Sequence, residues 1–214
     1  MKRSPVRHSA AVDRRRYERE FPLARNGVEL VVTTQPGVFS YGEADEGSLL
    51  LLDSVSPEAR PHWRVLDLGT GVGLIGLALA PLLSRGEVWM VDSDVRATRL
   101  AQRNVERNRL TNAHVLTGDG TLDLPKGLRF HAVVTNPPTH DGNLLLESLM
   151  RDAYAVLRPG GSLYVVVNRL LSVRQILTAI FGNCDIAARA HGFVVLHSRK
   201  ERRTAAGQTA FRVV

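Results

Sequence analysis

Apolar residues follow two alternating patterns along most of the chain. Short runs rich in β-branched residues predict strands, and longer stretches with apolar residues three or four positions apart predict helices. The predicted strands are 64–68, 87–91, 113–117, 131–135, 162–167 and 193–197, and the predicted helices are 73–83, 94–107 and 144–157. The last helix is followed by Arg158-Pro159-Gly160-Gly161, where proline and glycine cannot continue a helix.

The order of these elements predicts the fold class. The first five strands are almost continuously apolar, as expected of parallel strands that are covered on both faces. Repeated strand–helix–strand units predict a doubly wound α/β fold whose ligands bind outside the carboxyl ends of the strands. Residues 27–62, with a strand predicted at 28–33, are expected to form a short N-terminal cap before the first strand of the sheet.

Composition narrows the class of protein further. The single cysteine, Cys184, excludes an internal disulfide and a multi-thiolate zinc site, and the seven histidines show no metal-binding spacing, so no metal is expected. The most apolar run, Val72 to Leu83, has 12 residues, whereas a membrane span needs about 20. Residues 13–20 are charged where a signal peptide would be apolar. These features predict a cytoplasmic protein that is not embedded in a membrane.

Positive charge is concentrated at the two ends of the chain. Residues 1–26 hold eight basic and three acidic side chains, a net charge of +5, and residues 199–214 hold five basic and one acidic, a net charge of +4. The total is +7, so residues 27–198 carry −2. We predict a basic N-terminal arm at 1–26, a folded domain at 27–200 and a basic tail at 201–214. Solvated tails and contacts with nucleic acid both fit this distribution.

A glycine-rich turn follows the first strand predicted for the sheet. The segment Gly71-Val72-Gly73-Leu74-Ile75-Gly76 fits the G-x-G-x-x-G dinucleotide fingerprint, and Asp92 lies 21 residues after its first glycine. However, Gly69 and Thr70 intervene between the strand and that glycine, and Asp67 places a carboxylate where it would repel a pyrophosphate. A cationic ligand reverses this argument, because acidic side chains attract it.

Acidic residues lie at the ends of three successive predicted strands, at Asp67, Asp92 and Asp119. The D-x-G-x-G-x-G pattern from Asp67 to Gly73 resembles the first motif of Rossmann-like methyltransferases, which use S-adenosylmethionine. The resemblance implies a mostly parallel seven-stranded sheet with helices on both faces. It also implies that Asp92 binds the ribose hydroxyls of the cofactor and Asp119 its adenine amino group. The full set of cofactor residues it implies is Asp67, Gly69, Thr70, Gly71, Gly73, Asp92, Ser93, Asp119, Gly120 and Asn136.

The segment Thr135-Asn136-Pro137-Pro138-Thr139-His140 follows the fourth predicted strand. It resembles the [N/D]-P-P-[F/Y] motif of methyltransferases that modify planar amino groups on bases or on glutamine. Such an amino group is conjugated and weakly nucleophilic, so its hydrogens must be held to direct its lone pair at the methyl group. The Asn136 side-chain carbonyl and the Pro137 backbone carbonyl can accept those hydrogens, and the prolines stiffen the loop. The predicted catalytic residues are Asn136, Pro137 and Pro138.

The aromatic position of that motif is occupied by Thr139. A stacked base contributes about 1–3 kcal/mol to single-strand binding, so either another ring supplies the stacking or the activity is affected. Phe39 or Tyr41 could supply the ring from the cap. His140 could contact the substrate, or it could be an exposed loop residue.

A further motif lies in the cap, where Gln35-Pro36-Gly37-Val38-Phe39-Ser40 precedes Asp45-Glu46-Gly47-Ser48-Leu49-Leu50-Leu51, a stretch whose composition predicts a turn and a helix start capped by Ser48 or Asp45. Together with the later motifs, it resembles the small-subunit ribosomal RNA guanine-N2 methyltransferases from about Val28 to Lys200. Members with two tandem lobes are longer, and this chain matches the catalytic lobe. The resemblance implies methylation of a guanine 2-amino group in ribosomal RNA, read on an exposed base. The implied substrate contacts are Phe39, Ser40, Ser48, Thr139 and His140, with Arg14, Arg15 and Arg16 on phosphates.

Three alternatives to this function stay open. A protein glutamine-N5 methyltransferase uses the same amide geometry, but Thr139 and residues 36–40 fit it less well. A nucleotide-binding oxidoreductase leaves the Asn-Pro-Pro turn unexplained. A non-catalytic module that binds S-adenosylmethionine is suggested only by Thr139.

Overall fold

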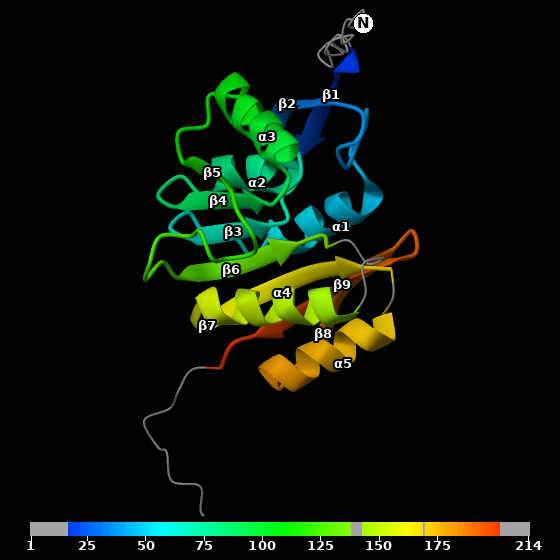
Figure 1. The fold of residues 1–214 in the computed structure, drawn as a ribbon, viewed down its shortest axis with the longest axis vertical. Coiled ribbons are helices and arrows are strands. Elements are labelled where there is room, and N and C mark those ends of the chain that lie inside the picture. Colours follow the sequence, from blue (N-terminus) through cyan, green and yellow to red (C-terminus); the bar gives the residue numbers. More distant parts are fainter. Residues whose placement is uncertain (1–16, 138–142, 169, 202–214) are drawn as a thin grey trace, which may run out of the picture.

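The computed structural model describes residues 17–137, 143–168 and 170–201, which are built around a seven-stranded sheet (Figure 1). The strands are β3 (Arg64–Leu68), β4 (Glu87–Asp92), β5 (Ala113–Thr117), β6 (Phe130–Thr135), β7 (Leu157–Val167), β8 (Asp185–Ala190) and β9 (Phe193–Arg199). Their order is β5-β4-β3-β6-β7-β9-β8. Strands β3 to β7 run parallel, and β9 is antiparallel to both β7 and β8. The predicted α/β fold with a mostly parallel, seven-stranded sheet is confirmed.

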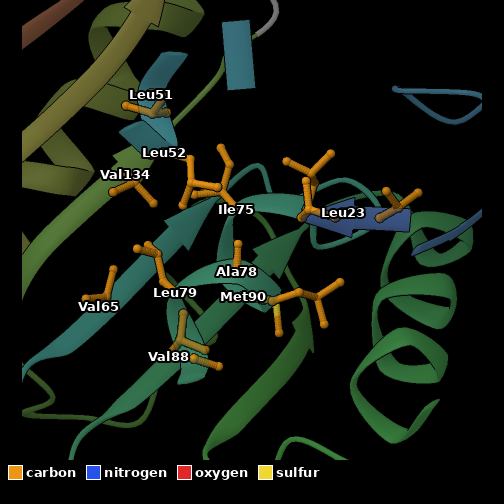
Figure 2. Packing of buried hydrophobic residues seen from close by; sticks show 14 of the residues in the cluster. Leu23, Leu51, Leu52, Val65, Ile75, Ala78, Leu79, Val88, Met90 and Val134 are labelled. Atoms are coloured by element: carbon orange, nitrogen blue, oxygen red, sulfur yellow. The ribbon is translucent and has the colours of Figure 1, made fainter. Parts of the chain in front are cut away.

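Helices cover both faces of this sheet, as predicted. One face carries α1 (Glu46–Val55), α2 (Leu74–Leu79), a 3₁₀ turn (Ala80–Leu82) and α3 (Val95–Arg107), and the other carries α4 (Asn143–Val156) and α5 (Leu170–Phe181). Neighbouring strand residues divide between the two cores: Val65 packs in the first and Leu66 in the second. Figure 2 shows part of the first core, with Leu51 and Leu52 of α1 near Ile75 of α2.

An antiparallel hairpin of β1 (Arg19–Arg25) and β2 (Val28–Thr34) starts the N-terminal cap, which therefore begins before the predicted residue 27. Its turn is Asn26-Gly27, where both residues adopt the positive φ that a two-residue hairpin turn requires. Asn104 of α3 and Asn108, which caps the C-terminus of that helix, each bond the backbone N–H and C=O of one β2 residue. The cap is therefore held by the helix that begins just after Asp92.

Three elements were not predicted from the sequence. β1 lies inside residues 1–26, where the density of charge hides the alternating buried positions Phe21 and Leu23. The edge strand β8 is exposed and rich in alanine, so it lacks a strand-like apolar pattern. α5 was also missed. β7 begins at Leu157, earlier than the predicted 162, because Arg158-Pro159-Gly160-Gly161 both follows the helix and starts the strand.

Candidate active site

The topology brings the predicted site residues to one edge of the sheet. β5, β4, β3 and β6 are parallel neighbours, so the segments after their carboxyl ends lie side by side. These segments carry, in that order across the sheet, Asp119 with Gly120, Asp92 with Ser93, the glycine turn from Gly69, and Asn136. The spacing of strands along the sequence was enough to predict this grouping.

Asp67 anchors the glycine turn from inside the fold. Its side chain is 1% exposed, and its Oδ2 accepts hydrogen bonds from Thr70 Oγ1 at 2.6 Å and Gly76 N at 2.8 Å. Its Oδ1 is buried without a hydrogen-bond partner among the described residues. Burial raises the pKa of Asp67 to about 6, and the nearby Asp92 charge contributes to the rise. A buried carboxylate in this state favours a positive charge nearby.

Four backbone amides of the glycine turn, those of Gly69, Thr70, Gly71 and Gly73, have acceptors within the protein. Gly69 N and Thr70 N donate to Val91 O at 2.8 and 3.0 Å, and Gly73 N donates to Thr70 O at 3.0 Å. Gly71 N donates to Asp92 Oδ2 at 2.8 Å. A pyrophosphate needs such amides as donors, and here they already have acceptors. This arrangement disfavours the dinucleotide interpretation and favours a ligand that seeks acceptors.

Asp92 holds the turn from the neighbouring strand. In addition to Gly71 N, its carboxylate accepts the Asp94 N–H at 2.9 Å, so its two oxygens are fixed in direction. Each carboxylate oxygen can accept a further hydrogen bond. Ser93, which follows it, is exposed at the same edge. Asp92 is thus an oriented acceptor at the end of β4, and its contact with the ribose stays a prediction.

A second acidic pair lies beyond β5. Asp119 is exposed, and Gly120 adopts positive φ so close to α4 that an added Cβ would lie 2.5 Å from Asp152 Oδ2. Burial, followed by the charge of Asp119, raises the pKa of Asp152. Asp152 was not singled out from the sequence, because nothing in the α4 pattern separates it from an ordinary helix-surface acid.

Asn136 is fixed by two residues of the cap. Its Nδ2 donates to Asp45 Oδ1 and to Ser48 Oγ, both at 3.0 Å. An ionised carboxylate can only accept, so the nitrogen of the amide must face Asp45 and the oxygen must face away. Among the described residues, the side-chain oxygen of Asn136, Oδ1, has no hydrogen-bond partner. The end of β6 therefore presents an oriented acceptor.

The cap residues predicted to contact the substrate belong to the same network. Ser40 Oγ donates to Asp45 Oδ2 at 2.8 Å, and Ser40 adopts a positive φ of 64°, which a non-glycine residue holds only at a cost. Ser48 is buried in the first turn of α1. Phe39, which precedes Ser40, is 60% exposed. Tyr41 is 43% exposed, and its hydroxyl donates a hydrogen bond to the backbone oxygen of Tyr17. Two uncovered aromatic rings thus flank the anchored serine.

Asp45 contacts the candidate site, although the sequence did not assign it there. It caps α1 through a 2.8 Å bond from Ser48 N to Oδ1, which is the role its position suggests. Its contact with Asn136 joins residues 91 positions apart, so no local pattern could reveal it.

Several predicted residues cannot be placed. Pro138, Thr139, His140, Arg14, Arg15 and Arg16 lie outside the described residues. Pro137 is buried directly after Asn136. Within the described ranges, no three or more histidine, cysteine or acidic side chains are grouped to hold a metal ion. No helix in the same ranges is long and apolar enough to cross a bilayer.

The sheet order, the acidic glycine turn after β3 and the Asn-Pro turn after β6 define the class of Rossmann-like methyltransferases. Residues 29–197 match the family model of the methyltransferase small domain. The chain belongs to that family.

Two curated proteins with similar sequences carry the same name. "Ribosomal RNA small subunit methyltransferase C" of Vibrio cholerae is 36% identical over 199 residues, which are 91% of this chain and 57% of the relative. The Pseudomonas syringae protein of the same name is 35% identical over 80% of this chain and 51% of its own. The chain therefore spans about half the length of the curated relatives it matches.

A solved structure agrees with these relatives. The T. thermophilus 16S rRNA N2 G1207 methyltransferase (RsmC), determined in complex with AdoMet and guanosine, matches with a TM-score of 0.78 and 32% identity. The match covers 94% of this chain and 53% of that one. A ribosomal protein L11 methylase of Lactobacillus delbrueckii, at 20% identity and a TM-score of 0.63, shares the fold alone.

Proposed function

We propose that this chain is an S-adenosylmethionine-dependent methyltransferase that modifies the 2-amino group of a guanine in ribosomal RNA. The observation that carries the proposal is the anchoring of Asn136 by Asp45 and Ser48, which orients an amide oxygen at the end of β6. The names of the relatives support the substrate. The basic arm and the tail would then contact RNA phosphates, through Arg14, Arg15 and Arg16. A ribosomal substrate also fits a cytoplasmic location.

The residues around the glycine turn fit S-adenosylmethionine. Asp67 and Asp92 supply negative charge, and the buried Oδ1 of Asp67 has no described partner. A side chain at Gly69 or Gly71 would meet no atom within 4 Å, so open space borders the turn. When bound, the cofactor supplies an electrophilic methyl group on a sulfonium. The residues proposed to hold it are Asp67, Gly69, Thr70, Gly71, Gly73, Asp92, Ser93, Asp119, Gly120 and Asn136.

In the proposed reaction, the main task of the protein is to position the guanine amino group. Asn136 Oδ1 and the Pro137 carbonyl accept the two N–H groups of the guanine amino group, which aims the nitrogen lone pair at the methyl group. Because the amide is anchored before the substrate arrives, little reorganisation remains at the moment of transfer. No strong base is needed when the nitrogen loses its proton after transfer. Pro138 would stiffen this loop.

Transfer of a tritiated methyl group tests the proposal. Undermethylated small ribosomal subunits and unmethylated release factor are offered separately, and the labelled product is mapped. We expect label on a guanine N2 in the RNA. Label on a glutamine of release factor would establish the protein-methylating alternative, and cofactor binding without transfer to either would establish a non-catalytic module. Tight binding of NAD in calorimetry, without binding of S-adenosylmethionine, would point to an oxidoreductase.

Phe39 is expected to provide part of the stacking surface that Thr139 lacks. Replacing Phe39 by alanine should raise the KM for RNA about 5-fold, because an exposed ring lies at the low end of the stacking range of about 1–3 kcal/mol. Phe39→Trp should keep the KM near that of the wild type. Ile186→Ala, which removes an exposed apolar side chain from β8, is the matched control. Equal KM values for Phe39→Ala and the control would assign the stacking elsewhere.

Cofactor affinity is expected to depend on the ionisation of Asp67. Its pKa of about 6 lies above the ordinary 3.8, so the carboxylate forms as pH rises through 6 and then attracts a cation. An α-amino group stays protonated from pH 5 to 7, with a pKa of about 8. The Kd for S-adenosylmethionine should therefore fall about 5–10-fold from pH 5 to pH 7 in calorimetry. Asp67→Asn should flatten that profile, and an unchanged profile would remove Asp67 from cofactor binding.

A further inference from the structure

A polar pocket lies at the end of the sheet opposite the proposed active site. It has a volume of about 290 Å³ and is lined by His62, Arg64, Arg85, Gly86, Glu87 and His131. Arg64 and Glu87 begin β3 and β4, and His131 is the second residue of β6. The carboxyl ends of these same three strands carry Asp67, Asp92 and Asn136. The pocket is therefore distinct from the methyl-transfer site but is built on the same strands.

Positive charge exceeds negative charge in this pocket. Glu87 is its one acidic lining residue, and its carboxylate already pairs with Arg64 Nε and with His114 Nε2. The Arg85 guanidinium has no carboxylate partner within the part of the chain that the structure describes. Arg85 is exposed, so its guanidinium can contact an anion with several acceptor oxygens from solvent.

His131 adds a neutral donor to the same pocket. Its Nδ1 accepts the Arg64 backbone N–H at 2.9 Å, so the proton of the neutral ring is on Nε2. Burial lowers the pKa of His131 to about 4, and the positive charges of Arg158 and Arg64 lower it in the same direction. The ring therefore stays neutral near pH 7, and its surroundings are electropositive.

We propose that this pocket binds a phosphate group of the RNA backbone, with Arg85 as the charged contact; this inference rests on the proposed RNA substrate. β3 has five residues, so at about 3.3 Å per residue the pocket and the active site lie about 17 Å apart along the strand. A folded ribosomal RNA segment spans that distance. The pocket would fix the orientation of the RNA while the opposite edge receives the target guanine.

Salt-dependent RNA binding tests the pocket. The full chain, Arg85→Gln and the control Arg189→Gln are titrated with undermethylated small-subunit RNA in filter binding from 50 to 200 mM KCl. Arg189 is exposed on β8, so the control removes the same charge from another surface. Loss of one phosphate contact should weaken binding by Arg85→Gln about 3–10-fold at low salt and reduce the slope of log K against log salt by about 0.7–1. Arg85→Glu should weaken binding further.

The outcomes separate this inference from the proposed function. If the wild type methylates guanine in the RNA and Arg85→Gln retains the affinity and slope of Arg189→Gln, the phosphate site is wrong and the proposed function stands. The same titration is repeated with intact undermethylated subunits. If Arg85→Gln loses affinity for the subunits but not for the naked RNA, the pocket receives an acidic protein segment and the inference is also overturned. A wild type that neither binds nor methylates RNA overturns both. Melting temperatures and the Kd for S-adenosylmethionine should be equal in Arg85→Gln and Arg189→Gln, which shows that the fold is intact.

Discussion

Replacing Asn136 by alanine is expected to lower kcat for RNA methylation about 100–1000-fold. The substitution removes the Oδ1 acceptor that holds the target amino group, and loss of one preorganised polar group at a reacting centre has effects of this size. The KM for RNA should change little, because most of the affinity comes from phosphate contacts remote from β6. Single-turnover transfer of a tritiated methyl group to undermethylated small subunits gives the rate directly.

Two comparisons keep this result specific to the amide. Gln102→Ala removes an exposed carboxamide from α3, where it bonds only Glu106 among the described residues, and should retain full activity. Asn136 is one of the residues proposed to hold S-adenosylmethionine, so Asn136→Ala should raise its Kd, but by no more than a few-fold, because the cofactor residues after β3 and β4 are unchanged. A kcat close to that of Gln102→Ala would remove Asn136 from the chemistry.

The sequence predicts those site residues that lie at the ends of strands. Asp67, Asp92 and Asn136 each lie at the end of an apolar run, and a doubly wound sheet places such ends at one edge. The acidic character of the turn was also readable. The sequence did not show that amides of the turn donate to Val91 O and to Asp92, because these hydrogen bonds depend on the register between β3 and β4.

Residues that act across long sequence distances escaped prediction. Asp45 reads as a helix cap, and only the packing of α1 against the sheet brings it to Asn136. Strand β1 was not predicted because charged residues surround its buried positions. Asn104 and Asn108, which bond β2, look like ordinary helix-surface residues in the sequence. In each case the tertiary contact, rather than local propensity, decides the role.

Asp45 is expected to act as a positioning residue for Asn136. Its Oδ1 receives both Ser48 N and Asn136 Nδ2, and its Oδ2 receives Ser40 Oγ. Asp45→Ala would leave Asn136 with one anchor, Ser48 Oγ, and the amide could then turn its nitrogen toward the substrate. Two N–H donors would then face each other, so kcat should fall about 10–100-fold while the KM for RNA stays within about 3-fold.

Asp45→Asn separates positioning from folding. Asparagine is as good a helix cap as aspartate, and its oxygen can accept from Ser48 N and Asn136 Nδ2 while its nitrogen donates to Ser40 Oγ. This variant should keep kcat within about 3-fold of the wild type. Asp45→Ala also loses the cap, about 0.5–2 kcal/mol of stability, so its kcat is measured well below its melting temperature. If the two variants lost activity equally, or if Asp45→Ala raised KM rather than lowering kcat, Asp45 would not act through the amide of Asn136.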